Sequence, residues 1–119
     1  MIRRLFLGFV LLSLPVAAYA AGPERALGSL KNGEAVFNVN CAKCHGLKGS
    51  GTDKGPPLVR KIYEPNHHSD LSFYWAVERG VRSHHWSYGD MPRIEGVSKA
   101  DTGDIIAYIR ALQKEAGIY

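Results

Sequence analysis

The pattern of apolar and polar positions divides the chain into an apolar leader and three helical segments joined by loops. Residues 5–16 are an apolar run interrupted only by Gly8 and Ser13. The segments at about 31–40, 70–79 and 99–114 carry helix start and stop signals. The stretches between them are rich in glycine, proline and polar residues, which form loops. These elements predict a small all-α protein.

The first helical segment is expected to begin after Ser29, a residue type that caps helix N-termini. Gly33 and Phe37 are four positions apart and therefore lie on one face of this helix. A glycine inside a helix costs about 1 kcal/mol relative to alanine, but it is tolerable where a second helix crosses closely. The alternative is a poorly formed helix in which the glycine is incidental.

The two later helices have clearer boundaries. The segment 70–79 ends at Gly80, and its aromatic and aliphatic positions are typical of a face that packs on a core. The last helix is predicted to begin after Ser98, with Asp101 placed as in a capping box. Gly103 is its expected weak point. Its apolar face is formed by Ile105, Tyr108, Ile109 and Leu112.

Residues 1–20 resemble a secretory signal peptide. Arg3 and Arg4 precede the apolar run, and Ala18-Tyr19-Ala20 is a small-residue cleavage site. A membrane span needs about 20 apolar residues, so this shorter run favours cleavage after Ala20, with an uncleaved membrane anchor as the alternative. We therefore expect a cleaved signal over residues 1–20, a flexible leader over 21–30 and one domain over 31–119, without membrane insertion of the mature chain.

Charge gives little indication of a partner. The formal net charge of the 119-residue chain is +4, and it falls to +2 when Arg3 and Arg4 leave with the signal. The mature part has neither a basic run nor an alternation of basic and aromatic residues. We therefore expect no nucleic-acid partner, and charge would act only through steering toward another protein.

The chemistry of the chain centres on two cysteines. Cys41 and Cys44 are three positions apart, and His45 follows directly. This spacing is typical of c-type haem attachment: the two thiols reach the two vinyl groups of one porphyrin, and the adjacent imidazole points at the iron. A thioredoxin-like dithiol would need a βαβ context, and structural zinc would need four protein ligands. Both alternatives stay open, zinc through the later histidines.

The loop that follows supplies a candidate partner for His45. Gly55-Pro56-Pro57-Leu58 cannot form a regular helix, and its prolines have carbonyl acceptors but no N–H. A histidine bound to a metal usually donates its other ring N–H to such an acceptor. We expect the Pro56 carbonyl in this role, with Pro57 second, or alternatively a rigid turn with no haem contact.

A second candidate iron ligand is Met91, which precedes Pro92 in an extended loop. The thioether is a soft neutral ligand, suited to an iron that changes charge. It is the only methionine outside the predicted signal. The alternative interpretation is that Met91 fills the core.

Taken together, these residues resemble the class I cytochrome c family. The resemblance spans most of the mature chain: the helix with Gly33 and Phe37, the motif from Cys41 to Gly46, the Gly55–Leu58 loop, Met91-Pro92 and the last helix. It implies three to four helices wrapped around one covalently attached haem c. It also implies His45 and Met91 as axial ligands, and a crossing of the first and last helices formed by Gly33, Phe37, Ile105 and Tyr108.

Two histidine pairs depart from that family pattern, His67-His68 and His84-His85. Three interpretations are open. The pairs are solvated loop residues or donors to haem propionates; or one of the four replaces Met91 on the iron, which would lower the potential; or together they bind a second metal such as copper or zinc.

The resemblance implies a periplasmic, monomeric mono-haem cytochrome that carries one electron at a time between a donor and an acceptor protein. No catalytic residues are expected, and therefore no enzyme activity. The alternatives are a haem-containing accessory subunit of a larger oxidoreductase and a sensor or metal-binding module. A peroxidase is disfavoured because Met91 would close the iron.

Overall fold

The computed structural model describes residues 28–119, so the predicted signal peptide and most of the leader lie outside the described residues. Four α-helices follow one another: α1 (Leu30–Asn40), α2 (Ala42–His45), α3 (Asp70–Arg79) and α4 (Lys99–Glu115). Two short 3₁₀ turns, η1 (Leu47–Gly49) and η2 (Lys61–Tyr63), lie in the loops. Within residues 28–119 there is no strand, only one isolated bridge between Val81 and Met91. The prediction of an all-α fold is confirmed.

The helix boundaries follow the capping residues. Helix α1 begins at Leu30, one residue earlier than expected, because the Ser29 side chain accepts from the Asn32 backbone N–H at 3.2 Å. Helix α3 has the predicted bounds. It is followed by Gly80, whose φ of +80° ends the helix. Helix α4 opens with a complete capping box between Ser98 and Asp101.

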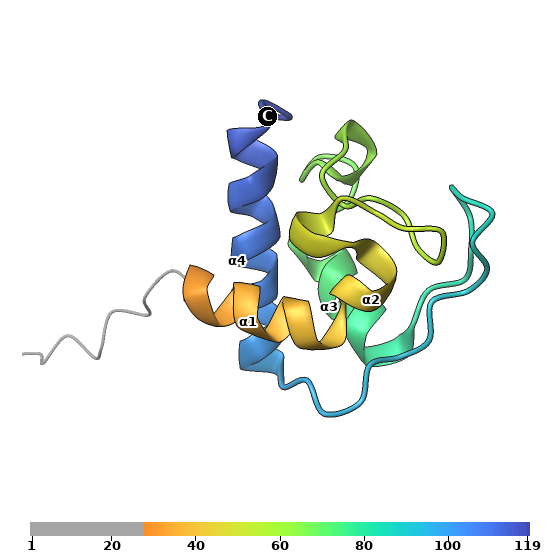
Figure 1. Cartoon of the computed structure of the whole chain (residues 1–119), viewed down its shortest axis with the longest axis horizontal. Coiled ribbons are helices and arrows are strands. Elements are labelled where there is room, and N and C mark those ends of the chain that lie inside the picture. Colours follow the sequence, from red (N-terminus) through yellow and green to blue (C-terminus); the bar gives the residue numbers. More distant parts are fainter. Residues whose placement is uncertain (1–27) are drawn as a thin grey trace, which may run out of the picture.

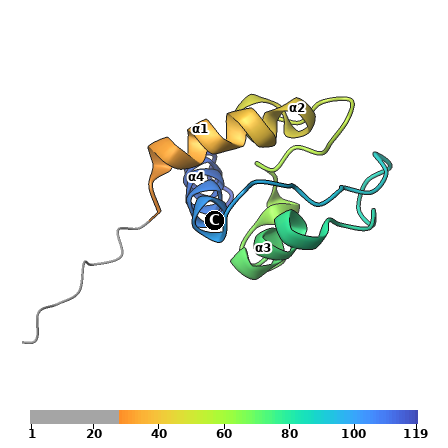
Figure 2. The ribbon, with the colours of Figure 1, turned by 90° about the horizontal axis from the view of Figure 1, so that it is seen from below.

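Helices α1 and α4 cross at Gly33. Figures 1 and 2 show α1 lying across α4, although the two helices are at opposite ends of the described chain. A Cβ atom on Gly33 would lie 2.0 Å from the Asp104 carbonyl oxygen, so only glycine permits this approach. The Phe37 and Tyr108 rings pack at 5.8 Å between centroids. The predicted crossing is confirmed, and the interpretation of Gly33 as incidental is wrong.

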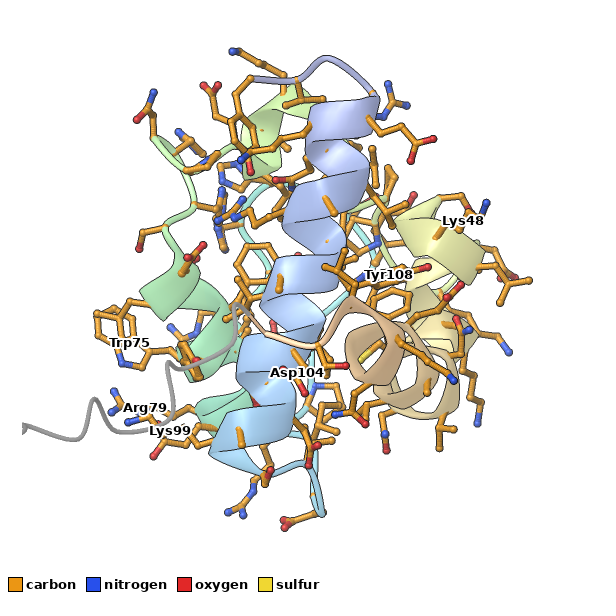
Figure 3. All side chains as sticks on the ribbon, turned by 90° about the vertical axis from the view of Figure 1, so that its left-hand side faces the viewer. Lys48, Trp75, Arg79, Lys99, Asp104 and Tyr108 are labelled. Atoms are coloured by element: carbon orange, nitrogen blue, oxygen red, sulfur yellow. The ribbon has the colours of Figure 1, made fainter. Side chains whose placement is uncertain are left out.

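Polar contacts extend this crossing toward the beginning of α1. The Asp104 carboxylate accepts from the Ser29 backbone N–H and from the Asn32 side-chain amide, both at 2.7 Å. Figure 3 shows Asp104 and Tyr108 at the edge of α4 beside α1, while Trp75, Arg79 and Lys99 lie on the other side of α4. Residues 29–32 are therefore held against α4.

Gly103 is a contact point between α3 and α4. A Cβ atom there would lie 2.8 Å from the Tyr74 hydroxyl. The glycine that the sequence marked as a weak point of the helix thus makes room for an aromatic side chain of α3.

The core formed by side chains alone is small. In the described part of the chain the buried hydrophobic residues are Phe37, Ile105, Ile106, Tyr108 and Ile109. All but Phe37 belong to α4, and α3 packs on the same helix. None of the helices in residues 28–119 has the length and apolarity needed to span a bilayer.

Candidate functional site

The two thiols and the first imidazole lie on one turn of helix. The Cys41 backbone N–H bonds to Phe37 O at 2.8 Å and closes α1, and His45 N–H bonds to Cys41 O at 2.9 Å in α2. Both thiols are free, Cys41 half-buried and Cys44 exposed. The chain then leaves the helix at Gly46, whose φ of +73° favours glycine.

His45 is oriented by the loop that follows it. Its Nδ1 lies 2.8 Å from the Pro56 carbonyl oxygen. A carbonyl only accepts, so Nδ1 carries the proton and Nε2 keeps its lone pair. Burial lowers the pKa of His45 below its usual 6.5, and the bond to Pro56 opposes that shift. The result is a neutral, fixed imidazole, the form that binds a metal.

The loop 46–58 is fixed from both ends. The Thr52 hydroxyl donates to Cys44 O at 2.6 Å, and the Leu58 backbone N–H donates to Gly49 O at 2.8 Å. Gly55 has no room for a side chain, because a Cβ atom would lie 2.9 Å from Cys44 O. The loop therefore holds the Pro56 carbonyl against the motif.

A cavity of about 540 Å³ opens beside this motif. That volume lies within the range of about 300–1,000 Å³ typical of small-molecule sites. Most of its wall is apolar, and it takes residues from all four helices and the loops between them. The wall includes Phe37, Cys41, His45, Pro56, Leu58, Phe73, Val77, Met91 and Ile105.

Met91 reaches this cavity from the long loop between α3 and α4. Its backbone N–H donates to Val81 O at 2.8 Å, and its carbonyl accepts from Val81 N–H at 2.9 Å. Gly80 packs against the same residue, since a Cβ atom there would lie 2.5 Å from Met91 O. The half-buried Met91 is thus fixed on the same cavity as His45. Cys44 is not part of the wall and stays exposed.

The Cys41 thiol does not have the lowered pKa of a redox dithiol. Burial raises the pKa of Cys41 to about 11, and the neighbouring Cys44 adds to the shift. Reactive dithiols depend instead on a lowered thiol pKa. Among residues 28–119 the cysteines also take no part in the cluster of potential metal ligands, which consists of His67, His68 and His85. The thioredoxin-like and cysteine–zinc alternatives therefore have no support in the geometry.

The four later histidines are close together in space. The His67 and His85 Nε2 atoms are 3.4 Å apart, and the His84 and His85 rings lie 4.2 Å apart between centroids. Burial first, and then the neighbouring imidazoles and Arg110, lower the pKa of His68. Desolvation and the other three imidazoles lower that of His85. His68, His84 and His85 also line the rim of the cavity.

Sequence reasoning missed two buried polar residues of α4 that support this region. Arg110 and Gln113 are 8% and 0% exposed. Gln113 donates to Leu58 O at 2.9 Å, and both side chains donate to Tyr63 O. The Arg110 Nε also donates to Asp70 at 2.8 Å. The sequence could have indicated these two residues, because both lie next to the apolar face of α4.

The residues around the cavity fit a haem group. An apolar wall suits a porphyrin, the Cys41 thiol lies in this wall with Cys44 three positions further along the chain, and an imidazole and a thioether reach the cavity from separate segments. The half-buried His45, whose Nδ1 bonds to the Pro56 carbonyl and leaves Nε2 free, has the arrangement expected of a ligand to iron. A family model described as Cytochrome c matches residues 30–113.

The chain belongs to the cytochrome c family. Members of this family bind haem c and transfer electrons, so this cytochrome is a haem-binding electron carrier. The match covers α1 to α3 and most of α4, a range that contains every residue proposed for the site. A search of curated proteins found no significant match to this cytochrome.

Proposed function

We propose that this cytochrome is a periplasmic carrier of single electrons that holds one haem c through Cys41 and Cys44, with His45 and Met91 as axial ligands. The observation that carries the proposal is the shared cavity: His45 and Met91, from segments far apart in sequence, line the same apolar space. The periplasmic location depends on the signal-like pattern of residues 1–20.

When bound, the haem supplies an iron centre that changes its charge by one electron. The side chains of the cytochrome provide the rest. The Pro56 carbonyl fixes the proton of His45 on Nδ1, which directs the Nε2 lone pair to the metal and raises its basicity. Met91 offers a neutral thioether, which suits both charge states. Phe37 and Ile105 exclude water from this wall of the cavity.

The two proposed ligands also favour an electron carrier over an enzyme. With an imidazole and a thioether both retained, no position on the iron would remain for a substrate. We infer that the cytochrome exchanges electrons with a donor and an acceptor protein and performs no reaction of its own.

The decisive experiment compares two variants by optical and near-infrared spectroscopy of the ferric and ferrous proteins. Met91→Ala is expected to change both spectra, because it removes one axial ligand. His84→Ala is the matched control: it removes an imidazole from the rim of the same cavity and should leave the spectra unchanged. Unchanged spectra in Met91→Ala, with a change in His84→Ala, would assign the ligand to the histidine loop.

Carbon monoxide separates the carrier from a gas sensor. The reduced wild-type protein should not bind carbon monoxide rapidly without denaturant, since Met91 would hold the remaining coordination position of the iron. The Met91→Ala variant should bind it. Rapid binding by the wild type would contradict the carrier function.

A further inference from the structure

Four imidazoles from two loops meet outside the proposed haem ligands. His67 and His68 precede α3, and His84 and His85 belong to the loop between Val81 and Met91. The ligand atoms of His67, His68 and His85 all lie within 4.8 Å of one another. Neither the cytochrome c family nor electron transfer requires this cluster.

Specific contacts bring the two loops together. The Trp86 indole N–H donates to the Tyr63 hydroxyl at 3.0 Å, which joins the loop of His84 and His85 to η2. The Tyr63 ring in turn lies 4.9 Å from the His68 ring. At the base of the loop, the pair of backbone bonds between Val81 and Met91 closes it. The position of the cluster is therefore fixed by its surroundings rather than by the imidazoles alone.

The backbone at His67 and His68 is fixed as well. Both backbone N–H groups donate to Glu64 O, at 3.0 and 2.8 Å. The Arg110 guanidinium donates to His68 O at 2.5 Å from the buried side of α4. A turn anchored at both its N–H groups and its carbonyl presents two adjacent imidazoles in a defined direction.

The spacing fits a tetrahedral metal ion. With metal–nitrogen distances of about 2.0–2.1 Å, two nitrogen ligands of such an ion are about 3.3–3.4 Å apart. The His67 and His85 Nε2 atoms already have this separation, at 3.4 Å. The distances to the third ligand atom, that of His68, are at most 4.8 Å. They would have to shorten by up to about 1.4 Å to reach tetrahedral spacing, and His67 and His85 are exposed side chains that can adjust.

The protonation pattern is also that of metal ligands. His68 Nδ1 donates to Ile62 O at 2.6 Å, and His84 Nδ1 donates to Arg82 O at 2.8 Å. Since a carbonyl only accepts, the neutral imidazole of His68 carries its proton on Nδ1 and keeps its lone pair on Nε2. A backbone carbonyl bonded to the far nitrogen is the usual outer partner of a metal-bound histidine.

We propose that His67, His68 and His85 form a binding site for one divalent late transition-metal ion, zinc or copper, at the rim of the haem cavity. The set consists of imidazoles, which suit these ions, whereas magnesium and calcium require oxygen ligands. His67 and His85 are exposed, so the ion can exchange with solvent. His68 lines the cavity, so the ion would lie next to the haem without sharing its axial ligands.

The test measures binding of Zn(II) to the haem-loaded protein, without an affinity tag, by equilibrium dialysis and calorimetry. One ion per chain is expected. His67→Ala and His85→Ala should each weaken binding by at least about tenfold, because even the outer partners of metal-bound histidines contribute about 10- to 100-fold to affinity. Glu115→Gln, which changes an exposed residue on the last turn of α4, is the control and should bind as the wild type does.

A second measurement uses Cu(II) and does not depend on the variants. Electron paramagnetic resonance of the copper-loaded protein should show coupling to at least two imidazole nitrogens.

The haem spectrum of each variant serves as the control for the fold and the proposed haem site. An unchanged haem spectrum distinguishes failure of the metal site from failure of the carrier function. Equal Zn(II) binding by wild type and His67→Ala/His85→Ala, or copper without nitrogen coupling, would overturn the proposal.

Discussion

At the scale of single residues, two helical glycines of this cytochrome have the same intrinsic cost and different surroundings. Gly33 faces the backbone of α4, where an added Cβ atom would lie 2.0 Å from the Asp104 carbonyl oxygen. Gly103 faces only the end of a side chain, the Tyr74 hydroxyl, which an added Cβ atom would approach to 2.8 Å. A hydroxyl on a rotatable side chain can move aside, whereas a carbonyl inside a helix cannot.

Alanine at each position separates these effects. At either site, alanine stabilises the helix by up to about 1 kcal/mol relative to glycine, because its helix propensity is higher. For Gly33→Ala we expect a net loss of about 1–3 kcal/mol in the free energy of unfolding, because α1 and α4 must separate. Gly103→Ala should be close to neutral. Urea unfolding of the haem-loaded proteins measures both, and an equal loss in the two variants would contradict the assignment of the crossing to Gly33.

At the scale of elements, the start of α4 contains a carboxylate whose charge stabilises the fold. Hydrogen bonds from Ser98 and then from Asn32 hold the pKa of Asp101 below its usual 3.8. The folded state therefore binds fewer protons at this group than the unfolded chain does. Its contribution is complete above pH 3.8 and is lost as the pH falls through the lower, folded-state value.

Asp101→Asn tests this dependence. At pH 7 the wild type should be the more stable protein, because the charged carboxylate accepts from the cap and favours the positive end of the helix dipole. The difference should disappear below the folded-state pKa of Asp101. Urea unfolding of both proteins from pH 7 into the acid range measures it, and haem-related acid effects cancel in the comparison. A difference that is constant with pH would contradict the role of the charge.

Capping signals and local spacing made the elements predictable from sequence, since a helix is specified by residues near each other in the chain. Ser29, Gly80 and Ser98 placed the helix boundaries to within a residue. The motif from Cys41 to His45 could be predicted for the same reason, because its residues are neighbours in the chain. The long-range contacts were not predictable: nothing near Arg110 or Gln113 indicates which carbonyls they reach. Nor does any local pattern show that His67 meets His85, because Trp86 and Tyr63 bring their loops together.

At the scale of the whole molecule, the proposed haem cavity lies between two parts of the fold. Figure 2 shows α1 and α2 on one side and α3 on the other, with the loop between α3 and α4 running back between these two parts. The buried hydrophobic side chains, Phe37 and those on one face of α4, centre on the crossing of α1 and α4, and Leu58, Phe73 and Val97 pack against them. The walls formed by α2, α3 and the Met91 loop meet at the cavity of about 540 Å³.

This division predicts that the cytochrome folds only with its haem. A chain of this size buries a modest share of its surface, and an apolar cavity of this size cannot persist facing water. The double variant Cys41→Ala/Cys44→Ala removes the proposed covalent attachment of the haem. We expect loss of cooperative unfolding and of the near-ultraviolet circular dichroism of the aromatic residues, with part of the α-helical signal retained. Met91→Ala is the matched control: it keeps the attachment and should retain both signals. A double variant that unfolds cooperatively like the wild type would show that the side-chain core is sufficient.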